Sequence, residues 1–167
     1  TAVTLEPRGL VADWDNGREE LTVWMGTQVP HMMQSVLATH LRLAENRVRV
    51  VGMETGGSFG LKIHTYPDEF AAVMLSRLLG RPVKFIADRL ESFSSDVHAR
   101  AHTARVEIAV SQDHQIRAFG VDGLLGIGAY SKHPRGSVNE VRHVVNLLGA
   151  PYQFAALHAH VRVAFQN

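Results

Sequence analysis

Hydrophobic and polar residues repeat along the chain with two different periods, which predict strands in some segments and helices in others. Apolar positions recur every second residue over 10–14 and again over 21–25, the period of a half-buried strand. Asn16 and Gly17 lie between these segments, and both residue types adopt the positive φ angles of a tight hairpin turn. We therefore predict a β-hairpin over residues 10–28.

Other segments also have the composition of strands. Their β-branched and aromatic residues are bounded by turn-forming residues, and they comprise residues 46–52, 81–89, 104–110, 116–130 and 156–165. A short polar segment, 111–115, separates two of them. The pattern predicts a second hairpin there.

Three segments instead repeat their apolar residues every three to four positions, which predicts helices. The first begins at Pro30, and its predicted inward face comprises Met33, Val36, Leu37, His40 and Leu41. The second begins at Pro67 and ends at Gly80, with an apolar stripe of Phe70, Val73, Met74 and Leu78. The third begins with the capping box Ser137-x-x-Glu140, and its predicted inward residues are Val141, Val144, Val145 and Leu148.

The order of these elements favours an α+β fold. Strand–helix–strand segments are mixed with hairpins, which predicts a mixed sheet with about three helices packed on it. A chain of 167 residues is long enough for a sizeable core. Residues 1–167 are therefore predicted as a single domain.

Composition narrows the classes of function. The net charge of +1 gives no reason to expect nucleic acid or an anionic membrane as partner, and no apolar segment reaches the ~18 residues of a membrane span. The chain has no cysteine, so it has no disulfide, thiolate nucleophile or iron–sulfur ligand of its own, which fits a reducing compartment. Its first residues lack the basic region and apolar core of a signal peptide and do not begin with Met, and we expect the chain to be a piece of a longer protein.

One glycine-rich segment, METGGSFGLKIH at 53–64, is the candidate for a binding loop. It is not a Walker loop, because no Gly-Lys-Ser/Thr follows, and it lacks GxGxxG spacing. Its backbone amides could form an anion-binding concavity. The alternative is a tight turn between a strand and a helix, and the residues alone leave both open.

The other polar residues do not predict a second site. His98 and His102 are four positions apart, but no cysteine or carboxylate completes a zinc site at the usual spacing. The charges at one strand end predict a surface or interface ion pair among Asp88, Arg89 and Glu91. Gln28 is a neutral amide at the end of a strand, able to donate and to accept hydrogen bonds.

Six motifs, in order, make the sequence resemble one family. They are LEPRG, LTVWMGTQVPH, VRVVGMETGGSFGLK, YPDEFAAVMLSRLLGRPVKFIADRLESF, HARAHTARVEIAV and GIGAY. In this order and spacing they resemble the molybdopterin-binding large subunit of the xanthine dehydrogenase and aldehyde oxidase family, in the N-terminal part of its cofactor-binding region. The resemblance extends from about residue 5 to residue 167.

The resemblance implies a molybdenum–molybdopterin site. The family's Thr-Gln pair falls on Thr27 and Gln28, and in relatives this glutamine hydrogen-bonds the apical oxygen ligand of molybdenum. The family's glycine loop lies beside the molybdenum and the pterin dithiolene, and it falls on Gly56, Gly57, Ser58, Phe59 and Gly60. No side chain of this chain is expected to ligate the metal. The nucleotide form of the cofactor, mononucleotide or cytosine dinucleotide, stays open.

Departures from the family pattern bear on activity. Ile63 stands where purine-oxidising members have a substrate-binding glutamate, which argues against a xanthine-type substrate. Ser58 replaces the usual glycine, a modest change, and Arg100 has no settled counterpart among substrate-contacting arginines. No Asp or Glu matches the family's general base, so no catalytic residue is predicted here. We expect the chain to be inactive alone.

The resemblance implies a role within a larger enzyme. That oxidoreductase would hydroxylate a small-molecule substrate at an aldehyde or N-heterocyclic carbon with water-derived oxygen. The expected partners are the remainder of the molybdenum subunit and subunits carrying iron–sulfur clusters and FAD, with a homodimer as a further option. Relatives occur in the cytoplasm, expected here, and in the periplasm. The alternative is a non-catalytic structural or assembly subunit that has lost cofactor binding.

Overall fold

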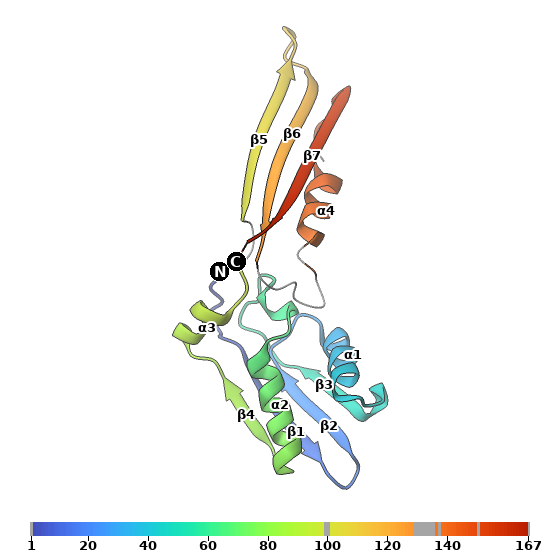
Figure 1. The fold of residues 1–167 in the computed structure, drawn as a ribbon, viewed down its shortest axis with the longest axis vertical. Helices are drawn as coiled ribbons and strands as arrows, with labels where there is room; N and C mark the ends of the chain where they lie inside the picture. Colours follow the sequence, from blue (N-terminus) through green and yellow to red (C-terminus); the bar gives the residue numbers. More distant parts are fainter. Residues whose placement is uncertain (1, 99–100, 129–135, 137, 150, 167) are drawn as a thin grey trace. The chain divides into compact units, whose positions relative to one another are not determined.

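The computed structural model describes residues 2–98, 101–128, 136, 138–149 and 151–166 (Figure 1). The chain divides into two compact units, Thr1–His98 and Ala99–Asn167. The described residues contain four α-helices and two mixed sheets, which confirms the predicted α+β class. The assignment of the whole chain to a single domain stays a prediction.

The first unit is built on a four-stranded sheet with the strand order β3-β2-β1-β4. β1 (Gly9–Asp15) and β2 (Glu20–Met25) form the predicted antiparallel hairpin, and β4 (Val83–Ile86) pairs antiparallel with β1. β3 (Val48–Gly52) pairs parallel with β2. A parallel pair needs a crossover connection, which the first helix supplies.

The helices of this unit connect or follow the strands of the sheet (Figure 1). α1 (Pro30–Leu41) and the 3-10 turn η1 (Glu45–Arg47) connect β2 to β3. A second 3-10 turn, η2 (Leu61–Ile63), precedes α2 (Pro67–Leu79), and α3 (Arg89–Ser95) follows β4. The predicted starts of α1 and α2 at proline are confirmed.

The core of the first unit lies between the sheet and the two longer helices. Alternate residues of the strands and one face of each helix form a single buried cluster that includes Leu10, Ala12, Trp14, Leu21, Val23, Met25, Met33, Leu37, Leu41, Val48 and Val73. His40, predicted on the inward face of α1, is exposed, with its ring 5.2 Å from the ring of Phe70.

The hairpin turn differs from its predicted form. The positive φ angle belongs to Glu19, at 54°, and neither Asn16 nor Gly17 has one. The reason is a four-residue connection in which Asp15 Oδ1 accepts the backbone N–H of Gly17 at 2.8 Å and of Arg18 at 3.0 Å. Aspartate at this position stabilises the turn through its side chain.

The predicted apolar stripe of α2 is wrong in part. Met74 and Leu78 are exposed, whereas Glu69 and Ser76 lie on the buried face. Ser76 is tolerated there because its hydroxyl oxygen accepts the backbone N–H of Trp14 at 3.0 Å. The buried face of α2 therefore combines apolar residues, among them Val73 of the predicted stripe, with polar residues that find partners inside the fold.

The charged residues after β4 form the start of a helix. Asp88 Oδ1 accepts the backbone N–H of Glu91, and Glu91 Oε2 accepts the backbone N–H of Asp88, both at 2.8 Å. This reciprocal pair is a capping box, which satisfies N–H groups at the start of a helix. Asp88 and Glu91 therefore cap α3, while an ion pair of these residues across an interface stays a prediction.

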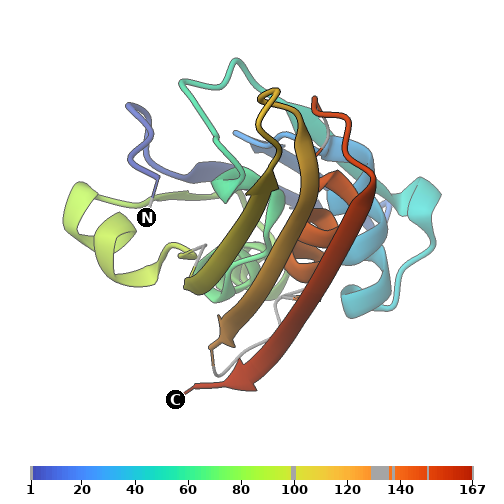
Figure 2. The ribbon, with the colours of Figure 1, turned by 90° about the horizontal axis from the view of Figure 1, so that it is seen from above.

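The second unit has a three-stranded sheet, whose strands lie side by side in Figure 2. β5 (His102–Val110) and β6 (Ile116–Ile127) form the predicted second hairpin, and β7 (Ala156–Phe165) pairs parallel with β6. α4 (Val138–Leu147) precedes β7. None of its described side chains is fully buried, and Val145, predicted inward, is exposed. Ser137 of the predicted cap lies outside the described residues.

Candidate functional site

Gln28 and the glycine loop (residues 53–60) meet because β2 and β3 are parallel neighbours. Met25 lies opposite Gly52 in the register, and the N–H of Met53 donates to the carbonyl of Met25 at 3.1 Å. Both strands end at the same edge of the sheet, where parallel sheets place their ligand sites. From this edge, β2 continues into residues 27–28 and β3 continues into the glycine loop.

The side chain of Gln28 is bonded directly to this loop. Its Oε1 atom accepts hydrogen bonds from the Ser58 hydroxyl and, at 3.1 Å, from the Gly60 backbone N–H. The backbone N–H of Gln28 and the hydroxyl of Thr27 both donate to the carbonyl of Lys62, at 3.2 and 3.0 Å. The structure thus brings together three of the predicted site residues.

The amide oxygen of Gln28 is bonded to the loop, whereas the amide nitrogen is left to donate to a ligand. Within the described ranges, the Nε2 group has no recorded acceptor, and the same holds for the backbone N–H groups of Ser58 and Phe59. Gln28 and Phe59 are exposed. These groups are uncharged donors, a set suited to a ligand that presents oxygen or other acceptor atoms.

Phe59 combines two unusual features. Its φ angle is 50°, in the left-handed region that non-glycine residues rarely adopt, and its side chain is 79% exposed. Gly57 and Gly60 on either side have φ angles of 95° and 90°. Strained backbone of this kind clusters at ligand sites, so Phe59 is a candidate ligand contact.

Gly56 is needed for a different reason. A Cβ atom added there would lie 2.6 Å from the Cβ of Glu6, closer than two such atoms can approach. A Cβ at Gly57 would lie 3.2 Å from the ring of Phe59. Gly56 therefore lets the N-terminal segment pass close to the loop, and Gly57 leaves room for the aromatic ring.

Two charged residues behind the loop were not among the predicted site residues. Lys62 Nζ lies 2.6 Å from Glu6 Oε2, and the lysine side chain is only 1% exposed. The hydrogen bond from Lys62, followed by that from the Gly56 N–H, lowers the pKa of the Glu6 carboxyl. The available signal was a lysine two positions after the loop, but its partner lies 56 positions away along the chain.

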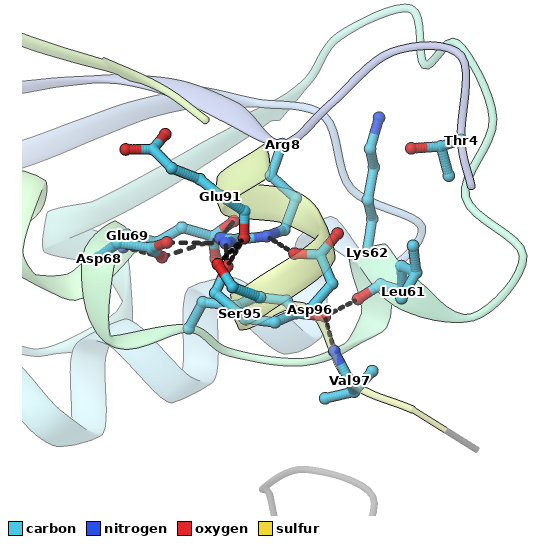
Figure 3. A network of polar contacts seen from close by, with 12 residues as sticks. Thr4, Arg8, Leu61, Lys62, Asp68, Glu69, Glu91, Ser95, Asp96 and Val97 are labelled. Atoms are coloured by element: carbon cyan, nitrogen blue, oxygen red, sulfur yellow. Dashed lines mark hydrogen bonds and ion pairs between the residues drawn. The ribbon is translucent and has the colours of Figure 1, made fainter. Parts of the chain in front are cut away.

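A second buried cluster surrounds Arg8 (Figure 3). Its guanidinium donates to both oxygens of Asp68 at 2.8 and 2.7 Å, to Asp96 at 2.6 Å and to Glu69 at 3.3 Å. It also lies 3.7 Å from the centroid of the Tyr66 ring. Arg8 thereby joins the N-terminal segment to the start of α2 and the end of α3.

Oppositely charged partners outweigh the effect of burial on the pKa of Arg8, but not on the pKa of Glu69. Burial alone would lower the pKa of Arg8, but hydrogen bonds to Asp68 and Asp96 raise it above its ordinary value. Burial raises the pKa of the Glu69 carboxyl to about 7, against the lowering effect of Arg8. Glu69 Oε2 has no hydrogen-bond partner. The cluster supports the fold and holds the elements that flank the site.

Other candidate residues do not assemble into a site in the described part of the chain. No group of three or more His, Asp or Glu residues there could hold a metal ion. His102 Nε2 lies 3.1 Å from Glu140 Oε2, and Arg105 pairs with Glu107 at 2.8 Å. Arg100 lies outside the described residues. Among the described helices, none is long and apolar enough to cross a membrane.

Known protein families and relatives resemble this chain over most of its length. The sequence matches the molybdopterin cofactor-binding domain over residues 1–167. It is 32% identical to the nicotine 6-hydroxylase large subunit of Paenarthrobacter nicotinovorans, over 80% of this chain and 16% of that protein. It is 30% identical to the carbon monoxide dehydrogenase large chain of Hydrogenophaga pseudoflava, over 98% of this chain and 20% of that protein.

Solved structures share the fold. Quinoline 2-oxidoreductase from Pseudomonas putida 86 matches with a TM-score of 0.85 and 29% identity, over 98% of this chain and 21% of that one. Carbon monoxide dehydrogenase from Oligotropha carboxidovorans matches with a TM-score of 0.81 and 31% identity, over 98% and 20%. The chain therefore spans about a fifth of the length of these relatives.

Proposed function

This chain belongs to the molybdopterin cofactor-binding domain family, and on that premise we propose that Gln28 and the glycine loop form one wall of a molybdenum-cofactor site. The observation that carries the proposal is the direct bonding of Gln28 Oε1 to Ser58 and Gly60. This bonding holds the side-chain donor of Gln28 next to the backbone N–H groups of Ser58 and Phe59, at one edge of the sheet.

The residues present fit the cofactor by their donor chemistry. The bound cofactor supplies the redox chemistry, and the protein supplies orientation and hydrogen bonds. Gln28 would donate from Nε2, because its Oε1 is already bonded to the loop. As a neutral amide, it would add no charge to the site. The backbone N–H groups of Ser58 and Phe59 would donate beside it, and the exposed Phe59 ring would exclude water from one side. We assign the cofactor-binding role to Gln28, Gly56, Gly57, Ser58, Phe59 and Gly60.

The complete protein is proposed to be an oxidoreductase that hydroxylates an aldehyde or N-heterocyclic carbon with water-derived oxygen. Relatives named for N-heterocyclic substrates, a nicotine 6-hydroxylase large subunit and a quinoline 2-oxidoreductase, support this. The chain would work with the remainder of the molybdenum subunit and with iron–sulfur and FAD subunits in the cytoplasm. It would be inactive alone, since the general base must come from elsewhere.

Metal and pterin analysis of the complete enzyme, purified with its partner subunits, tests the proposal. We expect molybdenum and pterin in wild-type protein and a loss of most of both in Gln28→Ala, because the variant removes the donor and releases the loop. Absence of molybdenum and pterin from a folded, fully assembled wild-type complex would overturn the proposal in favour of a structural or assembly subunit.

A further inference from the structure

The N-terminal segment of residues 4–6, here named the strap, runs against the glycine loop. The backbone N–H of Glu6 donates to the carbonyl of Gly56 at 3.0 Å, and the Gly56 N–H donates to Glu6 Oε2 at 2.9 Å. Glu6 therefore bonds both backbone groups of one loop residue. Because Glu6 approaches Gly56 so closely, no residue larger than glycine fits at position 56 without a shift of the backbone.

Lys62 connects the strap to the other end of the loop. Its buried ammonium pairs with Glu6 Oε2 at 2.6 Å, and its carbonyl accepts the two hydrogen bonds from Thr27 and Gln28. Its backbone N–H donates to the Ser58 hydroxyl oxygen at 3.3 Å. One residue thus contacts the strap, the loop and the segment that carries Gln28.

The strap is held by polar contacts rather than by apolar burial. Arg89, the first residue of α3, donates to the carbonyl of Thr4 at 2.7 Å and to that of Leu5 at 2.8 Å. The Leu5 side chain is 93% exposed, so it contributes little burial. Lys62 and Thr4 are both visible beside the Arg8 cluster in Figure 3. The position of the strap therefore depends on charged and hydrogen-bonding groups.

We propose that Glu6 and Lys62 are positioning residues that hold the glycine loop in the geometry in which it bonds Gln28. The inference rests on the proposed function for its consequence in cofactor binding, but the ordering of the loop is a separate property of the chain. Neither residue is placed against the cofactor. Both act through the loop: Glu6 bonds its first glycine, Gly56, and Lys62 lies two positions after its last, Gly60.

The buried ammonium determines what each substitution does. Glu6→Gln keeps an oxygen that can accept the Gly56 N–H, but it leaves the charge of Lys62 without its carboxylate partner. A buried charge without a partner is unfavourable, and opening of the loop lets the ammonium reach water while the sheet stays intact. Replacing Lys62 as well, in Glu6→Gln/Lys62→Met, removes both charges while keeping the amide acceptor and most of the side-chain volume.

The experiment is amide hydrogen exchange on the complete molybdenum subunit, combined with its molybdenum and pterin content. In Glu6→Gln we expect peptides covering residues 53–64 to exchange about tenfold faster, while peptides covering β1 and β2 stay unchanged. In the double variant we expect exchange within about threefold of wild type and recovery of the cofactor content lost in Glu6→Gln. Glu45→Gln, the same change at an exposed position outside the loop, is the matched control and should leave both unchanged.

The two readouts separate this inference from the proposed function. Unchanged exchange over residues 53–64 in Glu6→Gln would overturn the positioning role, whatever the cofactor content. Faster exchange throughout the first unit, including β1 and β2, would also overturn it, because the pair would then be a general stabilising contact. Faster exchange of the loop alone with full cofactor content would support the positioning role and instead contradict the proposed part of the loop in cofactor binding.

Discussion

The side-chain oxygen of Gln28 accepts a hydrogen bond of 3.1 Å from the backbone N–H of Gly60, 32 positions further along the chain. The Ser58 hydroxyl donates to the same oxygen. The amide is therefore oriented, with its acceptor toward the loop and its donor available to a ligand. This division of the amide into a structural half and a binding half leads to the first prediction.

Replacing Gln28 by glutamate should keep the acceptor that bonds the loop and remove the donor that faces the ligand. A carboxylate still accepts from Ser58 and Gly60, so the loop should keep its wild-type hydrogen exchange. The variant loses the Nε2 donor and gains a negative charge, and we expect cofactor content of the complete enzyme to fall about tenfold or more, since a hydrogen bond to a charged group contributes roughly 1.5–3 kcal/mol. Molybdenum analysis measures this. Gln153→Glu, an exposed control, should retain the cofactor, and equal content in both variants would contradict the donor role.

Gly56→Ala should disturb the loop through a steric clash. Its Cβ would lie 2.6 Å from the Cβ of Glu6, so the strap or the loop must shift. We expect the free energy of unfolding to fall by about 1–3 kcal/mol, the usual cost of overpacking, with faster amide exchange over residues 53–60. Gly52→Ala is the control, because a Cβ added there would approach nothing nearer than a Pro30 side-chain carbon at 3.8 Å. Denaturant unfolding of both variants checks the difference, and equal losses would show that the approach of Glu6 is not limiting.

Phe59→Ala should affect binding without affecting stability. The exposed ring contributes little burial, so the free energy of unfolding should change by less than about 0.5 kcal/mol. Loss of the ring beside the cofactor should nevertheless speed release of the cofactor from the complete enzyme during dialysis. Leu78→Ala, on the exposed side of α2 with a side chain that is 80% exposed, should change neither property. A loss of stability in Phe59→Ala without faster release would indicate a packing role instead.

The buried carboxyl of Glu69 predicts a pH dependence of stability. Its pKa is raised from 4.5 to about 7, chiefly by burial, so the folded state binds more protons than the unfolded state between these values. The stability of the wild type is therefore highest below about pH 4.5 with respect to this group and decreases as the pH rises toward 7.

Glu69→Gln cannot ionise and should remove this decrease. The unfolding free energy of the variant relative to wild type should therefore be greater at pH 8 than at pH 5, by on the order of 2–3 kcal/mol. Asp68, whose pKa is lowered by Arg8 against the effect of burial, loses its contribution only at more acidic pH in both proteins. Urea unfolding at pH 5, 6, 7 and 8 measures the difference. A constant difference across this range would show that Glu69 stays ionised throughout.

The local elements of this protein could be predicted from its sequence. The hairpin of β1 and β2, the starts of α1 and α2 at proline, and the strand before the glycine loop all follow from patterns within about 15 residues. Such patterns reflect backbone preferences and the period of burial, which neighbouring residues alone determine. Motif order likewise indicated the family and the six site residues, although their contact with the cofactor stays a prediction.

Only the tertiary structure decided which distant residues meet. Gln28 contacts Ser58 and Gly60 because β2 and β3 pair in parallel, a relationship that no local pattern specifies. The pairing of Glu6 with Lys62 and the burial of Glu69 next to Arg8 likewise join positions more than 50 residues apart. A periodicity argument assigns charged residues to the exposed face of an element. The fold nevertheless buries Arg8, Lys62 and Glu69, and each of these has an oppositely charged partner. The residue types of the site were therefore readable from the sequence, while the contacts that hold the site together belong to the fold.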